Sequence, residues 1–190
     1  YLKKEPDYYS TAEAVCEKIM NDNGGSFPFN DKYSCHVFLK IIDSENSTDV
    51  WMHDRNGFDA ILNFMCDAEN KFFERAEKGD SKLIDDMRLF CKNKLAKKDN
   101  KSLCSKICKY TSDYVFDNRD SFYIYDSVIA KMLPKYLDAY KCNLKFDYKN
   151  DTYNHLFKCL NELNEKANSV HECKLTKDEL DSIIWFSFRK

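Results

Sequence analysis

Glycine and proline are scarce in this chain, and that scarcity is the strongest constraint on its fold. The 190 residues contain four glycines and three prolines, whereas sandwiches and barrels need these residues at frequent tight turns. The alternation of apolar and polar residues that marks a half-buried strand is hard to find anywhere. Apolar residues make up 43% of the chain, which supplies a core and argues against disorder as the default. The sequence therefore predicts an all-α fold.

Helix-start signals and apolar stripes divide the chain into eight expected helices. Ser10–Glu13 and Thr176–Glu179 are capping boxes, which open helices through reciprocal side-chain and backbone hydrogen bonds. An apolar stripe at helical spacing runs from Phe58 to Phe72 behind a cap at Asn56. Pro134 is expected to interrupt the sixth helix, because it loses a hydrogen bond and clashes with the preceding turn. The expected helices cover about residues 10–20, 31–42, 56–72, 81–91, 102–116, 118–133, 152–167 and 176–190.

The most linker-like segment is polar and covers residues 43–49. It could separate an N-terminal helical segment, residues 1–48, from a ligand-binding domain of residues 49–190, the first piece then being a remnant of another domain. Alternatively, it is a surface loop within one continuous domain of residues 1–190, and loop-length statistics favour this second interpretation. No stretch approaches the ~18 apolar residues that span a membrane.

Nine cysteines are spread over the whole chain rather than gathered in paired knuckles, which is typical of a disulfide framework in a secreted protein. Because nine is odd, at most four bridges are expected within the chain, and one thiol stays unpaired or pairs with another chain. Glycosylation sequons at Asn46, Asn100 and Asn150, and a first residue that is not Met, agree weakly with secretion. The framework would use Cys16, Cys35, Cys66, Cys91, Cys104, Cys108, Cys142, Cys159 and Cys173.

Two of these cysteines, Cys104 and Cys108, are spaced to share one helix face. Each sulfur would more naturally reach a different neighbouring helix, so that three helices are stapled together. The alternative is a four-ligand zinc site with His155 and Cys159, which have the same spacing. That reading leaves five cysteines unexplained and departs from the usual zinc-knuckle spacing. We therefore predict no metal site.

Charge and motif content exclude several functions. Lys and Arg total 30 against 32 Asp and Glu, a net charge of −2 that is unfavourable for binding nucleic acid. Motifs of hydrolases, metalloproteases and phosphate-binding loops are absent from the sequence. Cys35 with His36, and Asp85 with Asp86, are neighbours on expected helices and point about 100° apart, which prevents joint catalysis. The sequence predicts a protein that is not an enzyme and needs no cofactor.

Aromatic residues make up 15% of the chain, and most of them are expected in the core. Disulfide-stapled helices can also enclose an apolar pocket for a small molecule. Glu179 and Arg88 are charges beside apolar stripes that could meet a ligand at the mouth of such a pocket. Glu179 also completes a capping box, and this structural role is the more expected one. The candidate ligand-binding residues are Glu179, Arg88, Tyr123, Tyr125, Trp185 and Phe186.

Several segments resemble, in their order along the chain, the long D7 salivary proteins of blood-feeding flies. The likeness covers roughly residues 30–190, and it includes a cysteine in an aromatic–Lys–Cys–Leu context and a closing acidic–aliphatic–aromatic helix. The segments are Cys35–Lys40, Phe90–Lys94, Leu103–Thr111, Lys141–Cys142, Tyr153–Leu160 and Asp178–Trp185.

The resemblance implies an all-helical, disulfide-stapled, non-enzymatic member of the odorant-binding-protein superfamily. Such a protein is secreted in saliva and sequesters biogenic amines or eicosanoid lipids, which suppresses haemostasis and inflammation during feeding. Two departures bear on the ligand. The chain in front of Cys35 is too short for a complete first, lipid-binding domain. Glu179 matches an acidic amine-binding position, but Thr176 replaces the companion acid one turn earlier.

A second hypothesis is an adhesin or surface antigen that binds a host protein. A composition rich in Lys, Asn, Asp and Tyr, with Cys-x-x-x-Cys-x-Tyr at residues 104–110, also suits helical cysteine-rich surface domains of malaria parasites. Aromatic and arginine side chains on an outer face would then bind the partner, and no cavity is needed. An enclosed apolar cavity would favour the scavenger, whereas a filled core with an exposed aromatic patch would favour the adhesin.

Overall fold

The structure, a computed structural model, describes residues 11–45, 50–92, 94 and 100–188, and within these ranges it is all-helical. This confirms the predicted all-α class. The helices are α1 Thr11–Asp22, α2 Lys32–Glu45, α3 Val50–His53, α4 Arg55–Cys66, the 3₁₀ helix Ala68–Asn70, α5 Phe72–Glu77, α6 Lys82–Cys91, α7 Lys101–Phe116, α8 Ser127–Ala139, α9 Tyr153–His171 and α10 Lys177–Phe188.

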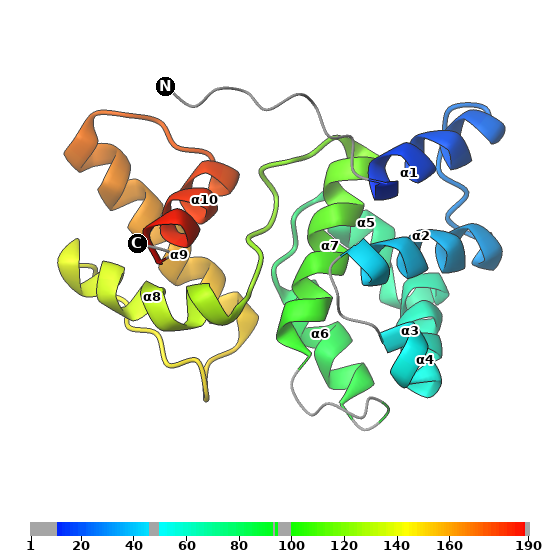
Figure 1. Cartoon of the computed structure of the whole chain (residues 1–190), viewed down its shortest axis with the longest axis horizontal. Helices are drawn as coiled ribbons and strands as arrows, with labels where there is room; N and C mark the ends of the chain where they lie inside the picture. The colour runs from blue at the N-terminus through cyan, green and yellow to red at the C-terminus, as the bar shows by residue number, and fades with distance from the viewer. Residues whose placement is uncertain (1–10, 46–49, 93, 95–99, 189–190) are drawn as a thin grey trace.

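The helices form two groups, α1–α7 and α8–α10, which lie side by side (Figure 1). The long helix α7 is central to the first group, because it packs against α1, α2, α5 and α6. In the second group α8 packs against both α9 and α10. A contact between α6 and α9 and the connecting segment 117–126 join the two groups.

Two expectations about the sixth helix are wrong. The segment 117–126 is not helical, because Asp117 adopts a left-handed conformation with φ 50° and ends α7. The helix begins only at Ser127, where the carboxylate of Asp126 accepts hydrogen bonds at 2.8 Å from two backbone N–H groups of the first turn. It then continues through Pro134 to Ala139. A single lost backbone hydrogen bond is tolerated here, since Leu133 and Leu137 beside the proline are buried in the core.

The expected helix over residues 56–72 is also divided in the structure. Asp54, rather than Asn56, caps α4 by accepting a 3.0 Å hydrogen bond from the Gly57 N–H. The helix ends at Cys66, and Phe72 belongs to a new helix, α5. Both halves of the predicted apolar stripe are buried. Periodicity therefore identified the buried face correctly but could not reveal the change of direction.

The first three residues of the polar segment 43–49 are helical, since α2 continues to Glu45. Asp43 lies within α2 and is buried, and its carboxylate accepts hydrogen bonds from the backbone N–H groups of Val50 and Trp51 at 3.0 and 2.8 Å. Residues 46–49 lie outside the described part of the chain. The division after residue 48 stays a prediction.

No disulfide is closed among the nine cysteines, all of which lie in described segments. Seven of them are buried, Cys66 is half-buried and Cys173 is exposed. Buried cysteines of this kind pack as small apolar side chains. No three His, Cys, Asp or Glu side chains in the described ranges form a cluster that could hold a metal. The four-ligand zinc alternative is therefore not assembled.

None of the helices in the described ranges is both long enough and apolar enough to cross a bilayer. The three sequons differ in their surroundings. Asn100 is buried at the start of α7 and Asn150 is exposed, whereas Asn46 lies outside the described residues. In the folded chain the side chain of Asn150 is therefore accessible for glycan attachment, whereas that of Asn100 is sterically blocked.

Tyr153, at the start of α9, fastens the connecting segment to the second helical group. Its side chain is fully buried, and its hydroxyl both donates to the Tyr123 carbonyl at 2.7 Å and accepts from the Tyr123 N–H at 3.1 Å. The carboxylate of Asp85 in α6 accepts hydrogen bonds at 2.8 Å from the N–H groups of Tyr153 and Asn154. One helix of the first group thus caps the first turn of α9.

We predict that Tyr153→Phe lowers the free energy of unfolding by about 1–3 kcal/mol, because it leaves a buried N–H and a buried carbonyl of Tyr123 without their partner. Urea denaturation followed by circular dichroism measures this change. Tyr148→Phe is the matched control, since Tyr148 is exposed. Equal losses in the two variants would contradict the role assigned to the buried hydroxyl.

Candidate functional site

An open groove of about 660 Å³ runs along one face of α10. Its described lining comes from α10 and from one residue just before that helix, at positions that share a helical face. We call this feature the α10 groove, and its lining residues are Leu175, Asp178, Glu179, Ser182, Ile183, Phe186 and Ser187.

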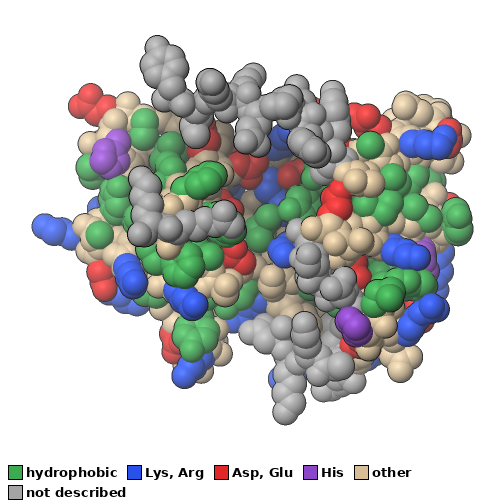
Figure 2. Space-filling model, viewed as in Figure 1, with side chains coloured by type: hydrophobic (Ala, Val, Ile, Leu, Met, Phe, Trp, Pro, Cys, Tyr) green, Lys and Arg blue, Asp and Glu red, His purple; other side chains and the backbone are tan. Residues whose placement is uncertain are grey.

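Two faces of α10 carry apolar side chains, and only one of these faces packs against the rest of the protein. Leu180 and Ile184 are buried in the core of the second helical group. Ile183 and Phe186 are 44% and 60% exposed at the groove. Hydrophobic side chains, in green, are visible on the half of the molecule that α8–α10 form, at the left of Figure 2. An exposed apolar patch next to acidic residues is the kind of surface that binds a partner.

The acidic end of the groove coincides with the helix start. The Thr176 N–H donates to the Glu179 carboxylate at 2.8 Å, and the Glu179 N–H donates to the Thr176 hydroxyl at 3.2 Å. These reciprocal bonds confirm the predicted capping box. Because Glu179 remains exposed, its charge still faces the groove while its position is fixed by the cap.

An ion cluster around a buried lysine connects this end of the groove to α7. The ammonium group of Lys109 lies 2.8 Å from both carboxylate oxygens of Asp113 and 2.9 Å from Asp178, and it donates to the Arg119 carbonyl at 2.6 Å. The Lys109 side chain is only 5% exposed. Asp178 therefore belongs both to the groove and to the contact between the two helical groups.

Two carboxyl groups near Lys109 have strongly raised pKa values. Burial raises the pKa of Asp113 to about 7, although Lys109 acts in the opposite direction. Burial also raises the pKa of Asp181 to about 7, and the negative charges of Asp126 and Asp178 add to this effect. Asp181 has a buried carboxylate oxygen that accepts no hydrogen bond from any described residue. This cluster therefore changes its charge near neutral pH.

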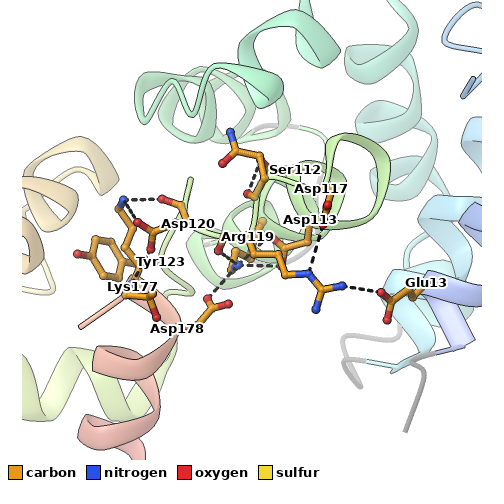
Figure 3. Close-up of polar contacts among 12 residues, drawn as sticks. Glu13, Ser112, Asp113, Asp117, Arg119, Asp120, Tyr123, Lys177 and Asp178 are labelled. Atoms are coloured by element: carbon orange, nitrogen blue, oxygen red, sulfur yellow. Dashed lines mark hydrogen bonds and ion pairs between the residues drawn. The ribbon is translucent and has the colours of Figure 1, made fainter. Parts of the chain in front are cut away.

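Further ion pairs hold the connecting segment on both sides (Figure 3). The guanidinium of Arg119 lies 2.8 Å from the Glu13 carboxylate of α1. On the other side, the ammonium group of Lys177 lies 3.6 Å from the Asp120 carboxylate, which also accepts a 2.6 Å hydrogen bond from the backbone N–H of Lys177. These contacts were not predicted from the sequence. Helical spacing could have suggested the local pair of Lys109 and Asp113, but no sequence signal pairs α7 with α10.

Three of the six predicted ligand-binding residues lie together at α10. Glu179 and Phe186 line the groove, and Trp185 is half-buried beside it. The Trp185 ring centroid lies 6.3 Å from that of Phe186, and its indole N–H donates to the Asp126 carboxylate at 3.2 Å. This grouping follows from their positions on one helix.

The other three predicted residues lie elsewhere. Tyr123 and Tyr125 are 1% and 9% exposed and belong to the core. Arg88 lies on α6, where its guanidinium pairs with Asp85 at 3.1 Å beside another depression, of about 290 Å³. The structure therefore does not bring Arg88, Tyr123 and Tyr125 to the α10 groove.

We predict that Asp181→Asn changes the pH dependence of stability. A carboxyl with a raised pKa stabilises the fold fully below its ordinary pKa, and this contribution is lost as pH rises through about 7. When the pH rises from about 5 to about 8, the free energy of unfolding should therefore fall in both proteins, and it should fall by roughly 1–3 kcal/mol less in the variant than in the wild-type chain. Chemical denaturation at a series of pH values measures this difference. Asp59→Asn, at an exposed position, should follow the wild type, and identical pH profiles for all three proteins would refute the assignment.

Comparison with known proteins adds no relative. No family model, no curated protein and no solved structure matches the chain. The likeness to the salivary proteins therefore remains a resemblance between short segments.

Proposed function

We propose that this chain is a non-catalytic recognition domain that binds a partner protein through the α10 groove. The proposal rests on the exposure of Ile183 and Phe186 on a helix whose other apolar face, formed by Leu180 and Ile184, is buried. Of the two functions that the sequence predicts, this exposed patch supports the adhesin more than the enclosed carrier. A depression that opens along one helix resembles a docking groove rather than a closed cavity.

The charges beside the patch indicate the chemistry of the partner. Asp178 and Glu179 lie at one end of the groove, and Phe186 lies about two turns further along α10. A complementary partner is an amphipathic helix with apolar residues at helical spacing and Lys or Arg near one end. Phe186 is the expected anchor, since large aromatic side chains dominate the energy of such interfaces.

Capture of a small amine is the second candidate function. The groove volume lies within the range of small-molecule sites, and its acidic end and apolar body match an aromatic amine such as serotonin. Glu179 and Phe186, two of the predicted ligand-binding residues, would then contact the amine and the ring. The openness of the groove makes this candidate the weaker of the two.

We place the protein outside the cell in either case, as the number and spread of the cysteines predict. The disulfide framework remains part of this proposal.

The test of partner binding uses two labelled model peptides with the same helical Leu stripe, one carrying a Lys cluster and the other a Glu cluster. The Lys peptide should bind, and Phe186→Ala should weaken its binding roughly tenfold. Glu179→Gln keeps a capping side chain but removes the charge, and it should weaken binding roughly threefold. Fluorescence anisotropy gives both dissociation constants.

The matched control is Leu89→Ala, which removes an apolar side chain that is 72% exposed on α6. It should leave peptide binding unchanged. Equal binding of the Lys and Glu peptides, or an unaffected Phe186→Ala variant, would argue against the α10 groove as the contact surface. Calorimetry with serotonin, histamine, a leukotriene and a thromboxane analogue tests the second candidate. Saturable heat that Glu179→Gln abolishes would replace the protein partner with a small amine.

A further inference from the structure

Two cysteines meet where α2 packs against α4. Cys35 lies in the second turn of α2, and Cys66 is the last residue of α4. The Cys35 thiol lies within hydrogen-bonding reach of two acceptors, the sulfur of Cys66 and the Phe29 carbonyl, the second at 3.8 Å. Lys32 donates to the Asn63 side chain at 2.8 Å, which independently fixes the start of α2 against the end of α4.

The two sulfurs differ in their access to solvent. Cys35 is fully buried, whereas Cys66 is half-buried and lines a depression of about 270 Å³ beside α5. A small molecule can therefore reach Cys66 first. The same depression is also lined by the aromatic residues Phe29, Phe72, Phe73 and Phe116.

The surroundings favour the thiolate at Cys66 rather than at Cys35. Donation from Cys35 and the positive charge of Lys32 lower the pKa of Cys66, against the effects of burial and of Asp31. The pKa of Cys35 is raised well above its usual value, because its proton is held by Cys66 and its sulfur is buried. The thiolate is the reactive form of cysteine.

We propose that Cys66 is a thiol-modification site with Cys35 as its resolving partner, so that a small disulfide such as oxidised glutathione drives closure of a Cys35–Cys66 bridge. This inference does not depend on the function of the α10 groove, which lies on another helix.

The reaction balances as two thiol–disulfide exchanges. The Cys66 thiolate attacks one sulfur of oxidised glutathione, forms a mixed disulfide and releases one glutathione thiolate. The sulfur of Cys35 then attacks Cys66, which closes the protein disulfide and releases the second glutathione. The two cysteines are oxidised, oxidised glutathione is reduced, and both cysteine protons end on the released thiols.

The experiment uses the full chain in a Cys173→Ser background, which removes the exposed thiol. The reduced protein is treated with oxidised glutathione, quenched with acid and studied by intact-mass and peptide mass spectrometry. The parent should lose two hydrogens and yield linked peptides that contain Cys35 and Cys66. Cys35→Ser should retain one glutathione on Cys66. Cys66→Ser should react roughly tenfold more slowly or not at all.

Cys108→Ser is the control for a buried cysteine, whose pKa burial raises, and it should behave as the parent does. Circular dichroism establishes that each variant is folded, and Cys35→Ala replaces Cys35→Ser if the serine is not tolerated. The linked peptides obtained from the parent protein show by themselves whether Cys35 and Cys66 form the bridge, so this test does not require a variant. A bridge from Cys66 to another cysteine, or equally fast oxidation of Cys66→Ser, would overturn the proposal.

Discussion

The arrangement of the two helical groups depends on the ion pairs and hydrogen bonds of the buried Lys109 ammonium group. A lysine excluded from water is tolerated only when its charge and its three protons find acceptors. Here the acceptors are Asp113 on α7, the Arg119 carbonyl in the connecting segment and Asp178 on α10. Helix α7 and the connecting segment that follows it are thereby held to α10, which is distant from both in sequence.

The position of the α10 groove follows from this contact. Asp178 is bound to Lys109, and the next residue, Glu179, closes the capping box, so the first turn of α10 is fixed from two sides. Leu180 and Ile184 then direct one face of the helix into the core. Ile183 and Phe186 remain exposed, since they lie on another face. The patch is thus a consequence of how the helix is anchored, and titration of Asp113 and Asp181 acts on the same anchor.

Local sequence signals predicted most of the helices and misplaced several of their ends. The capping box at Thr176–Glu179 was predicted because it depends on residues three apart, and it forms as expected. The start of α8 was missed, since the cap at Asp126 competes with an equally plausible start near Asn118. Pro134 was expected to break a helix whose buried neighbours hold it together. Tertiary packing outweighs local propensity at such positions.

The sequence by itself determined the helical class, the buried stripe from Phe58 to Phe72 and the cap of α10, because these depend on periodicity and on neighbours within one turn. It also placed Glu179, Trp185 and Phe186 on one helix. Only the tertiary structure decided that Tyr123 and Tyr125 are core residues, that Lys109 pairs with Asp178, and that Cys35 meets Cys66. These outcomes depend on how helices pack across long separations in sequence, and periodicity within one helix carries no information about its partner.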